Sequence, residues 1–471
     1  MKIAIIGLGY VGLPLSLQFA RSGVNVIGLD VDNGKVDALM RGESYIKHIE
    51  AREIQEQIKA GRFQASTDFG EVGAVEAVVI CVPTPLSKYR EPDISYVLET
   101  GRNIAPYLGA ERAAARSDQT GEAGRRAENG EGTDSGRTAV AVKTEFAAAK
   151  GTRPKLVVLE STTYPGTTDE DLRRVLEEGS GLKAGVDFHL AFSPEREDPA
   201  NPLSQVAKIP KVVGGYTPEC LERAQELYSK AIETLVPLSS CRAAEATKLL
   251  ENIFRGVNIA LVNELKMVYE AMGIDVWEVI DAAKTKPFGF MPFYPGPGLG
   301  GHCIPIDPFY LTWKAREFGQ HTRFIELAGE VNNSMPMYVV HRVADALNLR
   351  SIAVRGSRIL LVGLAYKPNV DDMRESPTFV LMDKLVDRGA NVSYYDPWIP
   401  EITPTREHDH WTGTCSVEWN KDVISSFDCV VISTAHSTVD YRELGEWATC
   451  IVDTRNAMAK AGADSGKVLK A

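Results

Sequence analysis

The chain has 471 residues, a formal net charge of −11, and 24% charged and 44% hydrophobic residues. At about 150 residues per domain this length predicts about three domains. The acidic balance argues against nucleic acid as a partner, and no apolar run approaches the roughly 18 residues of a membrane span. Seven cysteines without a CxxC pair argue against a disulfide framework and a zinc module. We therefore expect a reduced, cytoplasmic protein.

Short apolar runs alternate with helical segments at both ends of the chain. Four runs in the first third predict buried parallel strands, at residues 2–6, 24–29, 77–82 and 155–159. Four more strands follow from residue 358. This alternation predicts an α/β fold with two Rossmann-like, doubly wound parallel-sheet domains. The proline-free stretch 243–272, which stops at Gly273, predicts one long connecting helix in a helical central domain.

The predicted domains are a first Rossmann-like domain over residues 1–215, a central helical domain over 216–335 and a second Rossmann-like domain over 336–471. Residues 110–150 differ from their surroundings because most of this stretch lacks large apolar side chains. Such a segment cannot bury enough surface to offset its ordering entropy, so we expect a disordered insertion. A regulatory or partner-binding loop is the alternative.

A glycine-rich turn follows the first strand and opens a helix. Gly7, Gly9 and Gly12 have the spacing that permits a tight turn and close approach of a pyrophosphate. They also interrupt the apolar N-terminus, which argues against a signal peptide. Asp30 ends the next strand, where a carboxylate can accept hydrogen bonds from a ribose and repel a 2′-phosphate. The pattern predicts NAD rather than NADP; tight strand–helix packing is the alternative.

A loop rich in Gly and Pro holds the candidate nucleophile. It runs from Tyr294 through Gly300 to Cys303, and a carboxylate, Asp307, follows four residues later. A thiol can add to an aldehyde and, after hydride loss, leave a thioester. A small buried hydrophobic residue is the alternative for any cysteine. On the long helix, Lys248 and Asn252 share one face, and a lysine there could stabilise an oxyanion.

Further polar groups lie where ligands bind in open α/β sheets, beyond the carboxyl ends of strands. Thr162 follows one strand, Glu195 lies in a charged run after another, and Lys367 and Arg374 follow the first strand of the last domain. Solvated loops and surface ion pairs are the alternatives. The sequence His408-Asp409-His410 shows no third ligand nearby. We therefore expect a surface loop and no metal site.

Seven motifs identify a family resemblance. They are GLGYVGLP, CVPTP, LESTTYPGTT, SPERED, KLLENIFRGVNIALVNE, GPGLGGHCIPIDP and GLAYKPNVDDMRESP. In this order they resemble the UDP-glucose/GDP-mannose dehydrogenase family over the whole chain except the insertion. Within the family, the motifs are most similar to those of members that oxidise UDP-N-acetylglucosamine.

The resemblance implies that the three predicted domains bind NAD (1–215), form the dimer contact (216–335) and bind the UDP-sugar (336–471). It also implies roles for individual residues. Implied catalytic residues are the nucleophile Cys303, the acid Asp307, the oxygen-contacting pair Lys248 and Asn252, and the water-positioning pair Thr162 and Glu195. Implied NAD contacts are Gly7, Gly9, Tyr10, Val11, Gly12, Asp30, Lys35, Thr84, Thr162 and Arg374. Implied substrate contacts are Glu195, Lys248, Asn252, Arg255, Tyr294, Gly300 and Lys367.

The resemblance also implies a reaction and an assembly. The C6 hydroxyl of a UDP-N-acetylhexosamine would be oxidised twice by NAD, through a thiohemiacetal and a thioester on Cys303, in a homodimer or higher oligomer. UDP-N-acetylmannosamine and UDP-glucose are alternative substrates. A two-electron hydroxyacid dehydrogenase would share the glycine turn and the Lys/Asn pair without needing Cys303, and an NAD-sensing binding module would need the turn alone.

Overall fold

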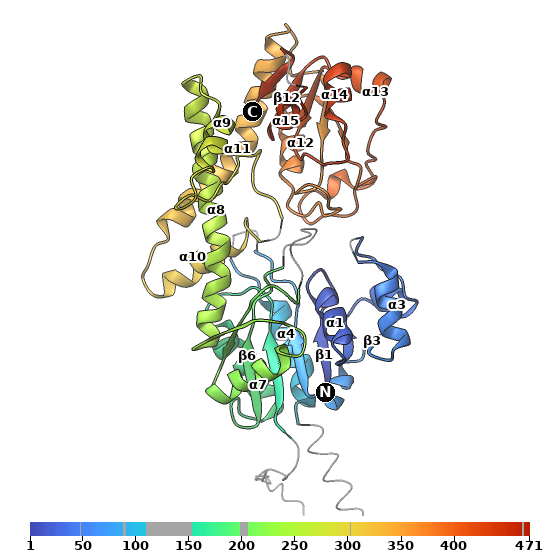
Figure 1. Cartoon of the computed structure of the whole chain (residues 1–471), viewed down its shortest axis with the longest axis vertical. Coiled ribbons are helices and arrows are strands. Elements are labelled where there is room, and N and C mark those ends of the chain that lie inside the picture. The colour runs from blue at the N-terminus through green and yellow to red at the C-terminus, as the bar shows by residue number, and fades with distance from the viewer. Residues whose placement is uncertain (48, 88–90, 110–152, 198–205, 302, 464–465) are drawn as a thin grey trace, which may run out of the picture. The chain divides into compact units, whose positions relative to one another are not determined.

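The computed structural model describes residues 1–47, 49–87, 91–109, 153–197, 206–301, 303–463 and 466–471 (Figure 1). These form two compact units: Met1–Thr84 with Asp93–Ala246, and Pro85–Pro92 with Thr247–Ala471. The predicted insertion at 110–150 lies outside the described residues. The three-domain division with boundaries at 215 and 335 stays a prediction.

An eight-stranded sheet forms the centre of the first unit. Its order is β3-β2-β1-β4-β5-β6-β7-β8. All neighbouring strands pair in parallel except β6 with β7, which are antiparallel. The strands are β1 (Lys2–Ile6), β2 (Asn25–Leu29), β3 (Phe63–Ser66), β4 (Ala77–Ile80), β5 (Lys155–Leu159), β6 (Phe188–Phe192), β7 (Lys211–Gly215) and β8 (Leu235–Leu238).

Helices cover both faces of this sheet. Successive side chains of a buried strand point to opposite faces, so each face has an apolar core of its own. Ile3 and Ile5 of β1 join one apolar core, whereas Ala4 and Ile6 join the other. The helices and helical turns are α1 (Gly12–Arg21), α2 (Asn33–Met40), α3 (Ala51–Lys59), η1 (Phe69–Ala74), α4 (Ser95–Ile104), η2 (Ala105–Tyr107), η3 (Thr167–Leu172), α6 (Arg173–Ser180) and α7 (Pro218–Tyr228).

The second unit joins a helical region to a smaller sheet. The long helix α8 (Cys241–Ala271) runs from the first unit into this one, and α9 (Val276–Ala283), α10 (Asp307–Glu317) and α11 (Arg323–Asn348) follow it. The parallel sheet has the order β10-β9-β11-β12-β13. Its strands are β9 (Arg358–Val362), β10 (Asn391–Tyr395), β11 (Cys429–Ile432), β12 (Ile451–Asp453) and β13 (Val468–Lys470).

Helices pack on both faces of the smaller sheet as well, around two apolar cores. They are α12 (Pro377–Asp387), η4 (Asp409–Trp411), α13 (Lys421–Ser425), α14 (Tyr441–Trp447) and α15 (Ala457–Lys460). Two sheets of mainly parallel strands and a helical region between them in the chain confirm the predicted fold class. The long helix predicted over 243–272 is α8.

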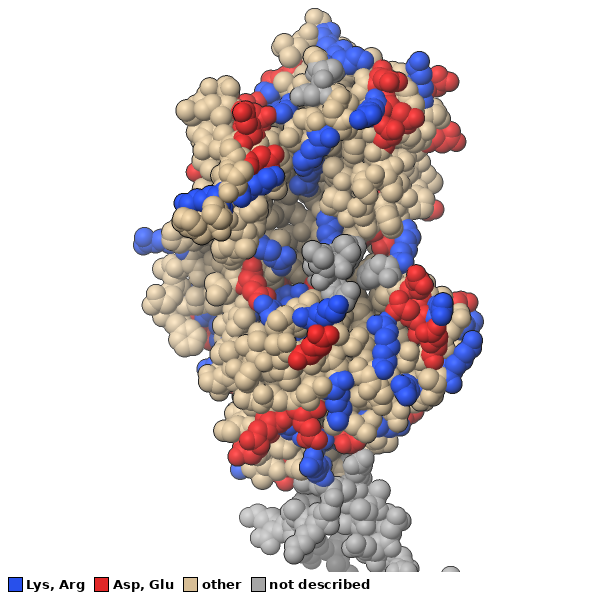
Figure 2. All heavy atoms as spheres, viewed as in Figure 1, with Lys and Arg blue, Asp and Glu red and all other residues tan. Residues whose placement is uncertain are grey.

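The surface agrees with the composition. Figure 2 shows basic and acidic side chains interspersed on the visible faces of both units, rather than one broad basic stripe. Among the described residues, no helix has the length and apolar character needed to cross a membrane.

Candidate active site

The glycine turn between β1 and α1 has the geometry of a dinucleotide site. Gly7 has a φ of +91°, a conformation that favours glycine. A Cβ on Gly12 would collide with the Gly7 carbonyl oxygen, so helix and strand meet here without a side chain. A Cβ on Gly9 would meet no protein atom within 4 Å. The backbone at Gly9 is therefore open to a ligand beside the start of α1, where free N–H groups favour phosphates.

Asp30 directly follows β2 beside this turn. Its Oδ2 accepts a hydrogen bond from the Leu8 N–H at 2.8 Å, and its Oδ1 accepts one from the Asp32 N–H at 3.0 Å. The Lys35 ammonium lies 3.6 Å from Oδ2. Each oxygen has two lone pairs, so the carboxylate keeps acceptor capacity for a ribose hydroxyl. Tyr10 and Val11 lie in the turn itself, and Thr84 follows β4; all three are partly buried.

The turn after β5 holds Thr162 and depends on a residue that the sequence analysis missed. Glu245, on the first turns of α8, is fully buried. Its carboxylate accepts hydrogen bonds from the Gly166 N–H at 2.8 Å, the Thr168 N–H at 2.9 Å and the Thr168 hydroxyl at 2.7 Å. Burial raises the pKa of Glu245 to about 7, against the opposing effect of these hydrogen bonds. Glu245 thus fixes the segment that follows Thr162.

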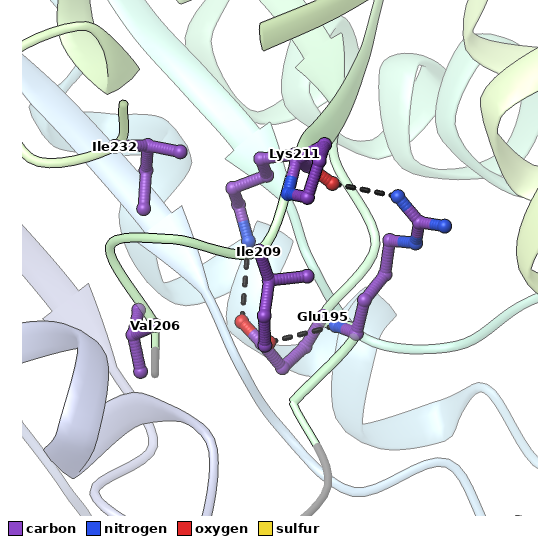
Figure 3. A pocket seen from close by; sticks show the side chains of 7 residues that line it. Glu195, Val206, Ile209, Lys211 and Ile232 are labelled. Atoms are coloured by element: carbon purple, nitrogen blue, oxygen red, sulfur yellow. Dashed lines mark hydrogen bonds and ion pairs between the residues drawn. The ribbon is translucent and has the colours of Figure 1, made fainter. Parts of the chain in front are cut away.

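Glu195 lies in a buried ionic cluster (Figure 3). Its Oε2 is 3.2 Å from the Lys211 ammonium, and its Oε1 accepts hydrogen bonds from the N–H groups of Arg196 and Glu197. Lys211 also binds Glu160, at 3.1 Å. A small pocket adjoins the cluster, lined by Glu195, Arg196, Val206, Ile209, Pro210, Lys211 and Ile232.

The three charged groups of this cluster shift one another's pKa values. Burial alone would raise the pKa of Glu195, but Lys211 and the backbone N–H groups outweigh it and hold that pKa below its usual value. Burial raises the pKa of Glu160 despite Lys211. Burial alone would lower the pKa of Lys211, but the two carboxylates raise it. Glu195 is therefore held ionised and in one orientation.

In the second unit, α8 and α10 bring three predicted residues together. Asn252 donates a hydrogen bond to Asp307 Oδ2 at 2.5 Å, and Arg255 donates one to Asn252 Oδ1. Asn252 and Asp307 are 0% and 3% exposed. Lys248 is buried one turn earlier on α8. The amide nitrogen of Asp307 donates to the carbonyl of Cys303 at 2.8 Å, which fixes the turn that carries the thiol.

The loop before Cys303 packs against the last domain within the same unit. A Cβ on Gly300 would lie 2.8 Å from Pro377, and one on Gly301 would lie 2.8 Å from the Tyr366 ring. The N–H of Gly301 also donates to the Arg374 carbonyl at 3.2 Å. Glycines here allow the cysteine loop to lie directly against the segment that contains Lys367 and Arg374. The predicted nucleophile loop and the predicted UDP-binding loop are thus neighbours. The neighbouring residue His302 lies outside the described residues.

Three predicted ligand residues have protein partners in this structure. The Arg374 guanidinium holds Asp372 through two parallel hydrogen bonds, at 2.9 and 2.6 Å. The Lys367 ammonium lies 5.7 Å from the Tyr366 ring centroid. The Tyr294 hydroxyl donates to Asp281 of α9 at 2.8 Å. Their roles toward NAD or substrate stay predictions.

Asn263, three turns beyond Asn252 on α8, is a structural anchor. Its Oδ1 accepts from the Gly296 N–H at 3.0 Å, and its Nδ2 donates to Asn332 of α11 at 2.9 Å. It thereby fixes the start of the cysteine loop.

Comparison with known proteins matches three segments of the chain to three domains of one family. Models of the UDP-glucose/GDP-mannose dehydrogenase family match it in order: the NAD binding domain at residues 1–115 and 135–232, the central domain at 242–334 and the UDP binding domain at 360–460. These matches agree with NAD as the predicted cofactor and with a UDP-binding domain at the C-terminal end.

Named relatives match most of the chain. It is 32% identical over 454 residues to UDP-N-acetyl-D-glucosamine 6-dehydrogenase of Pseudomonas aeruginosa, covering 94% of this chain and 92% of that one. It is 31% identical over 463 residues to UDP-N-acetyl-D-mannosamine dehydrogenase of Pyrococcus horikoshii, covering 97% and 96%. The structure of the latter enzyme superposes with a TM-score of 0.78 at 29% identity, covering 97% and 96%. The chain therefore belongs to the UDP-glucose/GDP-mannose dehydrogenase family of NAD-dependent nucleotide-sugar dehydrogenases.

Proposed function

We propose that this enzyme oxidises the C6 hydroxyl of a UDP-N-acetylhexosamine, UDP-N-acetylglucosamine before others, to the uronic acid with two NAD+. The observation that carries the proposal is the cysteine loop of the second unit. There Cys303 begins the turn into α10, Asp307 bonds Asn252, and Gly300 and Gly301 lie against the UDP-binding segment. Both cited relatives are named for N-acetylated UDP-sugars.

The protein supplies the nucleophile, the oxyanion-stabilising group and the base for two oxidations by NAD+. When bound, NAD+ accepts one hydride at each of them. The Cys303 thiolate adds to the aldehyde carbon, and the thiohemiacetal formed loses the second hydride to give a thioester. Water then adds to the thioester, which releases the acid and the thiol. Lys248 stabilises the oxyanions along this path, and Asp307, oriented by Asn252, accepts the proton of the attacking water.

The proposed cysteine nucleophile also indicates the cellular compartment. A thiolate that must stay reduced to act favours a reducing environment, so we place the enzyme in the cytoplasm.

The decisive assay measures NADH and acid formed from UDP-N-acetylglucosamine. We expect two NADH per acid, and we expect Cys303→Ser to lower kcat by about a thousandfold or more, as removal of a nucleophile does elsewhere. Cys415→Ser, which changes an exposed cysteine, is the matched control and should keep full activity. One NADH per turnover with release of an aldehyde would contradict covalent catalysis.

Competition between substrates tests the sugar preference. We expect kcat/KM to be higher for UDP-N-acetylglucosamine than for UDP-N-acetylmannosamine or UDP-glucose. A clear preference for either of the others would overturn the sugar assignment and leave the enzyme class intact.

We further propose that the active form is a homodimer joined through α8. Four large apolar side chains on this helix, and a fifth on the residue directly after it, are between 45% and 66% exposed: Leu250, Phe254, Leu261, Val268 and Met272. Their spacing of four and seven residues puts them on one stripe of the helix, a pattern typical of helix pairing. An exposed apolar stripe of this length is unfavourable in water.

Light scattering on the purified chain tests the dimer. Leu261→Asp should convert the dimer to a monomer because a charge would be buried in the contact. Leu349→Asp changes an equally apolar and more exposed residue (79%) after α11 and should leave the mass unchanged. A wild-type monomer would refute the assembly.

A further inference from the structure

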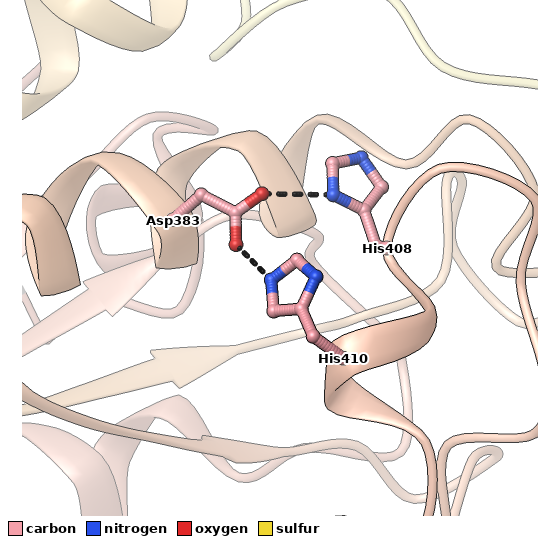
Figure 4. Close-up of side chains that lie close together, drawn as sticks. All are labelled: Asp383, His408 and His410. Carbon is pink, nitrogen blue, oxygen red and sulfur yellow. Dashed lines mark hydrogen bonds and ion pairs between the residues drawn. The ribbon is translucent and has the colours of Figure 1, made fainter.

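A cluster of two histidines and one aspartate lies on the last domain, outside the residues of the proposed reaction. His408 and His410 flank Asp409 at the short helix η4, and Asp383 lies on α12. His408 Nδ1 is 2.8 Å from Asp383 Oδ2, and His410 Nε2 is 2.7 Å from Asp383 Oδ1 (Figure 4). The sequence analysis missed a third group because Asp383 is a helix residue remote from the histidine pair in the chain.

The three side chains can each give one atom to the same cation. The two imidazole nitrogens and one carboxylate oxygen lie within 4.8 Å of one another. Among the residues that the structure describes, this is the one group of three or more metal-ligating side chains that does so. Two imidazoles and a carboxylate suit Zn²⁺ and similar divalent transition metals, whereas Mg²⁺ and Ca²⁺ prefer oxygen ligands alone.

The surroundings of the cluster hold its members in place. The Trp411 indole N–H donates to Asp383 Oδ1 at 2.7 Å, which leaves Oδ2 free of this donor. Hydrogen bonds of this kind, to a ligand rather than to the metal, orient the carboxylates of metal sites. The His408 ring stacks on Phe379 of α12, with centroids 5.0 Å apart and an interplanar angle of 13°.

Access and charge also fit a cation. The side chains of His408 and Asp383 are 17% and 29% exposed, whereas that of His410 is 58% exposed. An ion could therefore enter from the His410 side while the other two groups stay fixed. The Asp383 carboxylate is the one acidic group of the three side chains, and its negative charge would offset part of that of a cation.

We propose that Asp383, His408 and His410 form a binding site for a divalent transition metal of the Zn²⁺ class, which ties the turn at residues 408–411 to α12. The proposal is independent of the reaction proposed above. Its alternative is an anchor without metal, in which each ring nitrogen facing the carboxylate carries a proton and donates it. The two arrangements differ in protonation, since metal binding requires those nitrogens to be deprotonated.

Titration of the chelator-treated full-length protein with Zn²⁺, followed by calorimetry, separates the two. We expect saturation at one ion per chain, with affinity that weakens on acidification because protons compete for the imidazoles. Mg²⁺ should give no such binding. His410→Ala removes the most exposed ligand and should weaken Zn²⁺ binding by more than about tenfold, since even loss of an outer partner does so. His321→Ala changes an exposed histidine between α10 and α11 and is the matched control.

A second measurement excludes binding by cysteines, above all Cys303. Co²⁺ bound at the proposed site should lack the thiolate-to-cobalt charge-transfer band and should lose its absorption in His410→Ala. Zn²⁺ should also raise the Tm of the wild type and not that of His410→Ala, because a ligand that binds the folded state stabilises it. Absence of saturable Zn²⁺ binding, or equal binding by wild type and His410→Ala, would overturn the proposal.

Discussion

The two sheets begin with the same turn. In each unit a strand ends in a glycine with positive φ, +91° at Gly7 and +90° at Gly363. Each glycine N–H bonds the last carbonyl of the neighbouring strand: Gly7 to Leu29 at 2.7 Å and Gly363 to Tyr395 at 2.8 Å. In both, a carboxylate at the end of that strand accepts the N–H of the residue after the glycine. One local design is thus used twice.

The two carboxylates differ in what remains for a ligand. Asp30 accepts two backbone N–H groups and has the Lys35 ammonium nearby. Asp396 accepts four backbone N–H groups, two on each oxygen, and a hydrogen bond from the buried His436 at 3.0 Å. With every lone-pair direction used, Asp396 has none to offer a ribose. The first carboxylate can bind cofactor, whereas the second organises its own domain.

The segments after Gly7 and Gly363 also differ, in how soon a helix follows the glycine. Helix α1 begins at Gly12, so the first glycine turn leads directly into a helix N-terminus. Helix α12 begins only at Pro377, and the longer segment before it supports Gly300 and Gly301 of the cysteine loop. The glycine turn is therefore a strand–helix connection first, and the residues after it decide its ligand.

Asp396→Ala should have the largest effect. It leaves four buried N–H groups without an acceptor, at about 1–3 kcal/mol each for a group that finds no other partner. We expect at least about 3 kcal/mol of destabilisation, visible as loss of hydrogen-exchange protection in β9 to β13 and loss of UDP binding. NAD binding, which depends on the first unit, should persist. Asp30→Ala is the matched control and should stay folded; equal stability of wild type and Asp396→Ala would contradict the comparison.

Two buried carboxylates, Glu245 in the first unit and Asp396 in the second, should contribute to stability with opposite pH dependence. Folding raises the pKa of Glu245 to about 7, above the value of about 4.3 in unfolded chains. The folded state holds this proton more tightly, so the stabilisation is complete below about pH 4.3 and is lost as the pH rises through about 7. Burial alone would raise the pKa of Asp396, but hydrogen bonds from His436 and from the N–H groups of Ala365 and Trp398 outweigh it and hold that pKa below its usual value. The contribution of Asp396 is therefore lost only as the pH falls below about 4.

Thermal unfolding at about pH 5 and about pH 8 tests the first half of this prediction. Between them the wild type should lose stability of the order of 3 kcal/mol that Glu245→Gln, which cannot ionise, does not lose. Parallel pH profiles for the two proteins would show that Glu245 keeps an ordinary pKa.

Two substitutions in the first glycine turn test where a Cβ can be accommodated. Gly12→Ala should destabilise the first unit by about 1–3 kcal/mol, because the new methyl group would collide with the Gly7 carbonyl. Gly9→Ala has no protein atom in its way and should keep wild-type stability. It should nevertheless raise the Kd for NAD+ at least about tenfold, because that backbone is where a pyrophosphate approaches. NAD+ affinity unchanged in Gly9→Ala would refute the assigned cofactor position.

The sequence could predict those features that depend on residues close together in the chain. Strands, the glycine turn with Asp30, the long helix and the cysteine loop all follow from local periodicity and spacing, and the structure has the predicted fold class. The Asn252–Asp307 contact also had a signal, since both residues belonged to recognised motifs. That these groups act on NAD and a UDP-sugar as predicted stays a prediction.

The missed residues are joined by contacts between distant segments. Glu245 looks like any polar residue on a long helix, and only folding places it under the turn at Gly166. Lys211 begins an apolar strand, and its two carboxylate partners come from two other segments. A charged residue inside an apolar stretch was the available signal, because burying it requires partners. No local pattern names those partners.

The smallest expected effect concerns cofactor choice and rests on Asp30. Asp30→Asn keeps the shape of the side chain and an oxygen acceptor for the Leu8 N–H, so the turn should stay folded. It removes the charge that favours ribose hydroxyls and repels a 2′-phosphate. Loss of a hydrogen bond to a charged acceptor costs about 1.5–3 kcal/mol, so kcat/KM for NAD+ should fall about tenfold or more. Activity with NADP+ should rise, bringing the ratio of the two cofactors closer to one. The equivalent change Asp396→Asn, followed through the Kd values of the two cofactors because these need no UDP-sugar, should leave their ratio untouched, since Asp396 has no acceptor capacity left for a ribose. If the ratio stays at its wild-type value in Asp30→Asn, the two carboxylates do the same structural work and the cofactor is selected elsewhere.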